Sequence, residues 1–546
     1  MKKIIPFVLI SIFILSSCTP KEQPAKKTKL VVGIVIDQMR YDYLTRFADK
    51  YGADGFKRII KGGFSLENAH YNYIPTYTAV GHTSIYTGAT PDNHGVIGNN
   101  WYDKYAKEYI YCVDDANYTS VGVDSNGGNK SPYRMQTTTI TDQLRLAQNM
   151  NGKTISIAIK DRSSVLPGGH TANGAYWLEG KDEGKWITSS YYMKELPSWV
   201  TEFNASGKAA EYMSKPWNTL YDINTYTESL DDDNPFETNF KGKDKPVFPY
   251  DIPSLKENNG NYELLKVIPA GNSFTTDFVK AAIVGENLGK SEYTDFLAVS
   301  YSTPDYIGHQ FGVASKEVQD NYLRLDQDLA NLFSFLDTEV GKDNYTLFLT
   351  ADHAAVQVPA YLQSEKIPAH YVKSEEFKEF INNITLKYFK SDKLVENISN
   401  FQIFLNKEKI AELKLDVNIV AQKIADEAIN HDKMYKAVTA RTMQTTNFTD
   451  GILHKLQKGY NQKFSGDVLL IPLPATISSS SRTGTTHGSG YSYDTHVPVI
   501  FYGNGIKQGV SKKAYTITDI APTIANLLQI EFPNGTTGQI VKEALK

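Results

Sequence analysis

The chain is poor in cysteine. It has two cysteines in 546 residues, Cys18 and Cys112. Because Cys18 lies at the end of a predicted export signal, only Cys112 remains in the mature part, and no intrachain disulfide can form there. The stability of the exported protein must therefore come from a hydrophobic core or from bound metal.

Other features that would mark common function classes are also missing. The net charge is −4 with 41% hydrophobic and 22% charged residues, so the chain is globular in composition and has no basic excess for nucleic acid as a specific partner. No GxSxG elbow occurs, which leaves a Ser/His/Asp hydrolase without a nucleophile. The NGKT stretch at 151–154 lacks the first glycine of a Walker A loop and precedes its strand.

The N-terminus has the layout of a secretory signal over residues 1–17. Two lysines precede an apolar run at 4–15, which is too short to span a membrane, and small residues follow. The LSSC sequence ending at Cys18 resembles a bacterial lipoprotein box, with 18–29 as a flexible tether. Ordinary cleavage with release remains the alternative. Both predict a periplasmic or secreted protein, and the only membrane contact expected is through the lipid anchor at Cys18 if the lipoprotein box is used.

Short runs rich in branched apolar residues predict buried strands separated by helical segments. Helical periodicity is clear in 417–428, for example. This alternation indicates an α/β fold with a mostly parallel sheet between helices. The predicted strands are Leu30–Ile36, Ile155–Ile159, Phe296–Tyr301, Tyr345–Thr350, Val468–Ile471 and Val499–Tyr502.

Two segments interrupt the alternation, near 167–272 and 357–464. The first is rich in Trp, Tyr, Asn and Gly, and the second is rich in lysine with helical periodicity. The strand pattern resumes after each, so we predict one catalytic domain over 30–546 with these segments as inserted caps.

Acidic residues follow three of the predicted strands: Asp37, then Asp305 with His309, then Asp352 with His353. Ligands of open parallel sheets bind at the carboxyl ends of the strands, where these side chains would gather. A single Asp at a strand end would be an ordinary turn residue. Three together predict a metal centre.

The ligand types and their number indicate two zinc ions. Asp305 and His309 are four residues apart, which places both on one face of a helix. Carboxylate and imidazole without thiolate suit catalytic Zn²⁺, and five ligands are too many for one tetrahedral ion. A further ligand is expected in the glycine-rich stretch before the last strand, where His487 is favoured and His496 is interpreted as structural.

The stretch PTYTAVGHTSIYTG at 75–88 supplies the candidate nucleophile. Pro75 and Thr76 predict a helix start and Gly88 its end. A hydroxyl at a helix N-terminus faces free N–H groups that favour a phosphate-like anion. Both Thr76 and Thr78 fit that position, and spacing does not choose between them.

Taken in order, these stretches resemble the alkaline phosphatase superfamily, which also includes nucleotide pyrophosphatase/phosphodiesterases, arylsulfatases and cofactor-independent phosphoglycerate mutases. The resemblance covers Leu30 to about Leu528 and implies an alkaline-phosphatase-like core. The matching stretches are VIDQMR, PTYTAVGHTSIYTGATPDNHGVIGN, STPDYIGH, LTADH, THGSGYSYDTHVPVIFYG and TDIAPTIANLL.

The resemblance implies a role for each site residue. Thr78 matches the nucleophile that becomes transiently phosphorylated, and Asn99 matches an asparagine that donates to a phosphoryl oxygen, with Asn100 as its alternative. No magnesium site is implied. The implied zinc ligands are Asp37, Thr78, Asp352 and His353 for one ion, and Asp305, His309 and His487 for the other.

The substrate class is indicated by Lys160 and Arg162, in AIKDR after a predicted strand. They resemble the Lys/Arg pair of the threonine-using, phosphate-irrepressible bacterial alkaline phosphatases, which suits the extra charge of a monoester. A surface basic turn is the alternative. The sulfatase CxPSR motif is absent. We therefore predict a zinc-dependent phosphomonoesterase, with a phosphodiesterase on the same scaffold, or a binding protein that kept its metals, as alternatives.

Overall fold

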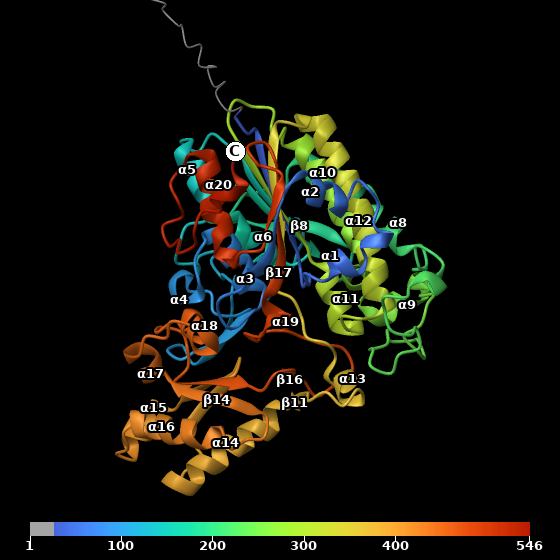
Figure 1. Ribbon diagram of the computed structural model, residues 1–546. Helices are drawn as coiled ribbons and strands as arrows, with labels where there is room; N and C mark the ends of the chain where they lie inside the picture. Colours follow the sequence, from blue (N-terminus) through green and yellow to red (C-terminus); the bar gives the residue numbers. More distant parts are fainter. Residues whose placement is uncertain (1–26) are drawn as a thin grey trace, which may run out of the picture.

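A central sheet runs through the middle of the molecule, with helices on both of its faces (Figure 1). The computed structural model describes residues 27–546, so the predicted signal peptide and Cys18 lie outside the described residues. The longest path through the sheet begins at the edge strand β18 (Gly509–Ser511) and runs in the order β18-β2-β17-β10-β1-β9-β6-β7-β8-β5.

The centre of this sheet is parallel. β10 (Tyr345–Thr350), β1 (Leu30–Ile36), β9 (Asp295–Tyr301), β6 (Thr154–Ala158) and β7 (Gly174–Glu179) pair in parallel. Every residue of the first four is buried, as expected for strands covered on both faces, and branched apolar side chains suit that position. The predicted bounds of β1 and β10 match, and β6 begins one residue earlier than predicted.

Helices cover the two faces of the sheet. One layer holds α3 (Thr78–Thr87), α5 (Ile140–Ala147), α6 (Asp161–Gly168) and α20 (Ile520–Leu528). The other holds α2 (Phe56–Gly62), α10 (Ala270–Gly285), α11 (Thr303–Phe311) and α12 (Lys316–Leu336), to the right of the sheet in Figure 1. The predicted mostly parallel sheet between helices is therefore confirmed.

The two edges of the sheet depart from the parallel pattern. β17 (His496–Gly503) is antiparallel to β10 and to β2 (Phe64–His70). At the other edge, β8 (Lys185–Ser189) is antiparallel to β7, and the small β5 (Ser120–Val121) pairs with it. Because β7 and β8 belong to the sheet, the predicted insertion near 167–272 contains part of the core as well as the helices that follow it.

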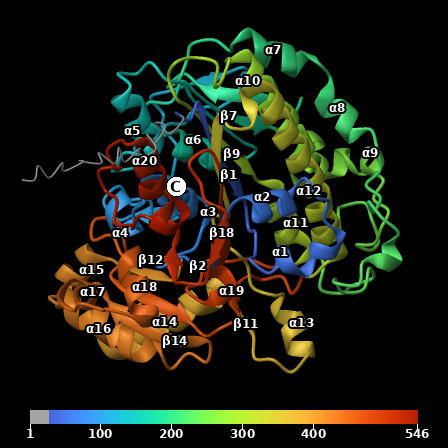
Figure 2. The same ribbon diagram turned by 45° about the horizontal axis from the view of Figure 1, so that its top comes forward.

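A small lobe stands apart at one end of the molecule in both views (Figures 1 and 2). Its sheet has the order β12 (Val395–Ser399), β13 (Gln402–Leu405), β15 (Val468–Pro472) and β14 (Met434–Thr439). Helices α14 (Ser374–Phe389) and α16 (Val417–Ala428) pack on it around a separate hydrophobic core. The assignment of Val468–Ile471 to the central sheet is thus wrong, since an apolar run looks the same in either core.

Chain order and strand order together place the functional residues. The adjacent strands β10, β1, β9 and β6 are parallel, so their carboxyl ends lie together, on the side of the sheet that faces the small lobe. None of the described helices is long and apolar enough to cross a membrane.

Candidate active site

Four neighbouring strand ends deliver charged side chains to one place. Asp37 follows β1, Asp352 follows β10, Lys160 follows β6, and Asp305 lies on α11 directly after β9. The fold thus brings these side chains together at the carboxyl ends of the strands, as predicted.

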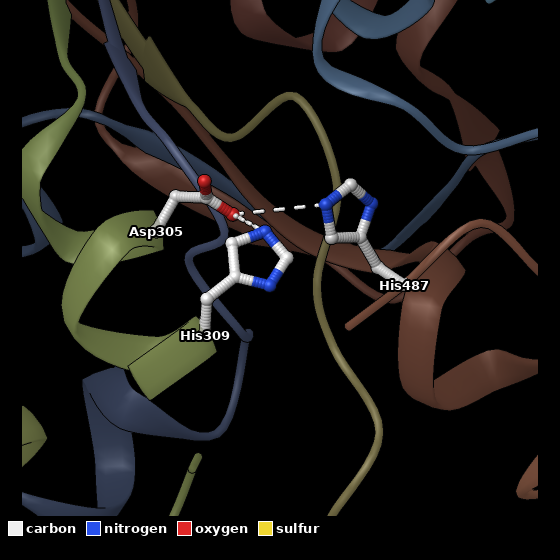
Figure 3. A group of neighbouring side chains, drawn as sticks. All are labelled: Asp305, His309 and His487. Atoms are coloured by element: carbon white, nitrogen blue, oxygen red, sulfur yellow. Dashed lines mark ion pairs between the residues drawn. The ribbon is translucent and has the colours of Figure 1, made fainter. Parts of the chain in front are cut away.

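Asp305, His309 and His487 form one cluster, drawn in Figure 3. Asp305 Oδ1 is 3.1 Å from His309 Nε2 and 3.7 Å from His487 Nε2. The two histidines approach the carboxylate from different elements, α11 and the 484–490 loop. Their ligand atoms lie within 4.8 Å of one another, which is the spacing that one cation requires.

A second group adjoins the first. His353 Nε2 lies 3.6 Å from Asp37 Oδ1 and 3.5 Å from Asp352 Oδ2, and all three side chains are fully buried. Asp37, Asp305 and His353 also have ligand atoms within 4.8 Å of one another, so the Asp305 carboxylate lies between the two groups. The structure thus brings together every histidine and aspartate predicted as a ligand.

The histidines are oriented as metal ligands usually are. In each, Nδ1 lies within hydrogen-bond distance of a main-chain carbonyl, so the neutral ring donates from Nδ1 and directs the lone pair of Nε2 at the carboxylates. These pairs are His309 with Thr485 O at 2.8 Å, His353 with Ala354 O at 3.1 Å and His487 with Thr76 O at 2.7 Å.

The charges of the cluster do not balance. Lys160 Nζ lies 2.8 Å from Asp37 Oδ2 and 2.5 Å from Asp305 Oδ2. One lysine faces three buried carboxylates, and Asp37 Oδ1 and Asp352 Oδ2 are buried without a hydrogen-bond partner among the described residues. Buried anionic oxygens without partners are costly unless a cation coordinates them. The donor set therefore fits divalent metal.

The pKa shifts follow from burial and from these neighbours. Burial and the Asp352 carboxylate hold the pKa of Asp37 well above its ordinary value, and burial raises the pKa of Asp352 to about 7. Burial opposes ionisation of Asp305 as well, but His309 and Lys160 outweigh it and lower the pKa of Asp305 well below its usual range. Burial lowers the pKa of His487 to about 3, which keeps this ring neutral.

The candidate nucleophile lies at the start of α3. This helix begins at Thr78, two residues later than predicted from Thr76, and ends at Thr87, with Gly88 as the C-cap that stops it as predicted. Thr76 pairs instead with the glycine-rich loop, since its Oγ1 donates to Ser489 O at 2.9 Å. Thr78 Oγ1 lies 3.4 Å from His353 Nε2. A Cβ at Gly81 would lie 2.1 Å from Asp352 O, so glycine lets α3 approach the site.

Asn99 and Arg162 flank this helix. Asn99 Oδ1 accepts from Ala79 N at 2.8 Å, which leaves its Nδ2 as the group that can donate elsewhere. The alternative, Asn100, is exposed in the hairpin strand β3 (Asn100–Asp103). Arg162 Nη1 donates to Tyr111 Oη at 3.0 Å, and its Nε is buried without a partner among the described residues.

The other polar residues of the 75–88 stretch have structural partners. Thr83 and Thr87 donate to main-chain carbonyls one turn earlier, and Ser84 contacts His94. His82 lies within hydrogen-bond distance of Thr78 O and Ser300 Oγ, and its Nδ1 is also 3.3 Å from Asp352 Oδ2, so this ring borders the cluster. His496 stacks on Tyr41 and His70 outside the cluster, as its structural interpretation requires.

Sequence reasoning missed Gln38 and Asp494. Gln38 contacts both Asp305 and Asp352, and only its position directly after Asp37 could have signalled it. Asp494 accepts from Gly488 N and Ser489 N at 3.1 and 2.8 Å and so shapes the loop that carries His487. Its position in a tyrosine-rich stretch gave no sign of this.

Comparison with known proteins places this geometry in a family. A family model described as type I phosphodiesterase / nucleotide pyrophosphatase matches residues 31–495. The match spans all the strand ends described above.

Several relatives match over nearly the whole chain. A calcium-transporting ATPase of Myroides odoratus is 45% identical, with 95% of each chain covered. Alkaline phosphatase PhoV of Synechococcus elongatus is also 45% identical, over 96% of this chain and 94% of its own. Alkaline phosphatase PafA of Elizabethkingia meningoseptica is 41% identical over 96% of each chain. A crystal structure of alkaline phosphatase PafA is 41% identical, is matched over 96% of this chain and 100% of its own, and has a TM-score of 0.92. The resemblance to alkaline phosphatases is confirmed.

Proposed function

The chain belongs to the type I phosphodiesterase / nucleotide pyrophosphatase family, and we propose that within it this protein is an alkaline phosphatase that hydrolyses phosphate monoesters through a phosphothreonine intermediate. The position of Thr78 carries the proposal. Its hydroxyl is buried at the first residue of α3, 3.4 Å from His353 Nε2, and that nitrogen lies 3.6 Å from Asp37 Oδ1 and 3.5 Å from Asp352 Oδ2. A hydroxyl at a helix N-terminus within a cation-binding cluster is placed for attack on an anionic phosphoryl group.

We propose that two Zn²⁺ ions complete the site. Asp37, Thr78, Asp352 and His353 would hold one, and Asp305, His309 and His487 the other. Nitrogen and oxygen donors with neutral imidazoles support this choice. When bound, zinc supplies charge neutralisation at the phosphoryl oxygens and lowers the pKa of coordinated hydroxyl groups.

The residues of the chain would act in two displacements. Thr78 Oγ gives up its proton and forms a bond to phosphorus as the ester P–O bond breaks, and the departing oxygen takes up a proton and leaves as an alcohol. Water then gives up a proton and attacks phosphorus from the side that the alcohol left, the Thr78 Oγ–P bond breaks, Thr78 Oγ takes up a proton, and phosphate departs. Asn99 Nδ2 would donate to the phosphoryl oxygens, together with the N–H groups at the start of α3 other than that of Ala79, which donates to Asn99 Oδ1. Two in-line steps give net retention of configuration at phosphorus.

Lys160 and Arg162 favour a monoester over a diester. Both carry positive charge at the N-terminal end of α6, a helix that packs against α3, and a monoester dianion has one more charge to stabilise than a diester. Once divalent metal compensates Asp37 and Asp305, Lys160 is free to contact the substrate. A phosphodiesterase is retained as the alternative function, because the matching family model is described as type I phosphodiesterase / nucleotide pyrophosphatase.

A matched substrate series tests the proposal. We expect phosphate release from monoesters to exceed the turnover of diesters and sulfate esters, with zinc content measured on the same sample. ATP belongs in the series because the Myroides relative is named an ATPase. Thr78→Ala should abolish turnover and trapping of phosphothreonine while zinc stays bound. Thr83→Ala removes a hydroxyl of the same helix that bonds Ala79 O, and serves as the control.

Two outcomes would contradict the proposal. Turnover that survives Thr78→Ala would exclude the phosphothreonine route, and faster diester than monoester hydrolysis would favour the alternative. We also propose a periplasmic or secreted location, with lipidation of Cys18 as the finer claim.

A further inference from the structure

Gln38 is a buried residue with an unusual backbone at the centre of the site. It directly follows Asp37, is 3% exposed, and has a φ of 65°. Glycine adopts this left-handed region freely, whereas a side chain such as glutamine is strained there. Strain of this kind persists where the surrounding contacts hold it, and it is concentrated at functional sites.

Gln38 contacts one carboxylate from each predicted ligand set. Its main-chain N–H donates to Asp352 Oδ1 at 3.1 Å, and its side-chain Nε2 donates to Asp305 Oδ1 at 2.6 Å. Asp352 follows β10 and Asp305 lies beyond β9, on opposite sides of β1. Gln38 therefore connects Asp305 with Asp352. Among the described residues, no other hydrogen bond connects these two side chains.

Gly308 makes room for the carboxamide. A Cβ at Gly308 would lie 1.9 Å from Gln38 Oε1, closer than any real contact. Gly308 is on α11 between Asp305 and His309, so the glutamine side chain lies against the turn of helix that bears two ligands of one set. This packing orients the amide so that Nε2 faces Asp305.

We propose that Gln38 is a positioning residue that fixes the Asp305 and Asp352 carboxylates relative to each other and so sets the spacing of the two metal-ligand sets. The inference rests on the proposed two-zinc phosphatase. Donors that orient ligating carboxylates commonly change metal affinity or activity by about 10–100-fold when removed.

Gln38→Gly is the most informative variant. Glycine accepts the left-handed backbone and keeps the N–H that bonds Asp352, so only the bond to Asp305 is lost. We expect one zinc equivalent to leave at a chelator concentration about 10–100-fold below that of the wild type, followed by a similar fall in kcat. The unfolding midpoint of the metal-free protein should stay close to that of the wild type. Zinc release is measured with a zinc-sensitive dye.

Two further variants separate the role from folding. Gln38→Glu keeps the size but replaces the donor with an anion beside Asp305, and Gly308→Ala displaces the unchanged carboxamide, so both should weaken the same zinc equivalent. Gln529→Gly is the matched control, because Gln529 also has a left-handed backbone, with a φ of 57°, outside the site. It should change neither zinc release nor turnover.

The outcomes distinguish this inference from the proposed function. If the wild type binds no zinc or releases no phosphate, the proposed function fails. If the wild type does both, and Gln38→Gly and Gln38→Glu match its chelator dependence and kcat, the positioning role is overturned. Parallel loss of both zinc equivalents with an equally lowered unfolding midpoint would also overturn it, because that pattern shows only a damaged fold.

Discussion

Replacing Lys160 with alanine should separate two roles of its positive charge, compensation of the buried carboxylates and contact with the substrate. In the structure its Nζ contacts Asp37 and Asp305 at 2.8 and 2.5 Å, and the side chain is 2% exposed. Removing one member of a buried ion pair typically costs about 3–5 kcal/mol, because the remaining charge has no partner. The metal-free variant should therefore unfold at a clearly lower temperature, and zinc should restore most of the loss by taking over the charge compensation.

The effect on catalysis should depend on the substrate. Loss of one donor to the transition-state oxygens commonly lowers kcat by about 10²–10³-fold. We expect a loss of that size for a monoester, and a smaller one for a diester, which lacks the extra charge that Lys160 would contact. Thermal unfolding with and without zinc and kcat/KM on a matched ester pair measure both effects. Lys153→Ala removes a half-exposed lysine that pairs with Glu286, and is the control.

Either of two results would contradict these roles of Lys160. An unchanged unfolding midpoint for metal-free Lys160→Ala would show that the lysine does not compensate the carboxylates. Equal losses for monoester and diester would show that it does not select the dianion.

Three further predictions concern other parts of the chain. Thr76→Val deletes the bond to Ser489 O and should cost about 1 kcal/mol of stability with little change in kcat; a large fall in kcat would reopen the choice between Thr76 and Thr78. Burial raises the pKa of Asp494 to about 7, so the folded state holds this proton more tightly than the unfolded state, and stability should decline as pH rises from about 4 to about 7. Asp494→Asn should flatten that decline in unfolding midpoints, and an unchanged slope would contradict it. Cys18→Ser should move the protein from the membrane fraction to the soluble periplasmic fraction if the lipid anchor exists, and an unaltered distribution supports simple cleavage.

Local patterns were sufficient for the parts of the fold where burial alone decides conformation. β1 and β10 are runs of apolar residues buried on both faces, and their bounds could be read from the sequence. The same signal failed for 468–471, because an apolar strand in the small lobe has the same composition as one in the central sheet. Which sheet a strand joins depends on long-range pairing that no short window contains.

The site shows the same division. Asp37, Asp305 and Asp352 were predictable because each directly follows a recognisable strand, and parallel pairing of β10, β1 and β9 brings such positions together. The choice of Thr78 over Thr76 was not available from spacing, since both lie near the start of the same predicted helix, and only the family resemblance favoured Thr78. The structure adds the contact of Thr76 Oγ1 with Ser489 O in the 484–490 loop, a partner 413 residues away in sequence.

Gly308 is required at the site for a reason that the spacing of the ligands Asp305 and His309 does not reveal. The four-residue separation of Asp305 and His309 follows from helix geometry, and any residue at 308 would preserve it. Glycine is required there for a different reason, because the Gln38 carboxamide occupies the space that a Cβ would take. The requirement links α11 to the end of β1, two elements whose contacting residues Gln38 and Asp305 are 267 residues apart in the chain but adjacent at the site. A single added methyl at 308 should therefore disturb Asp305 without touching either ligand, which makes the glycine part of the site.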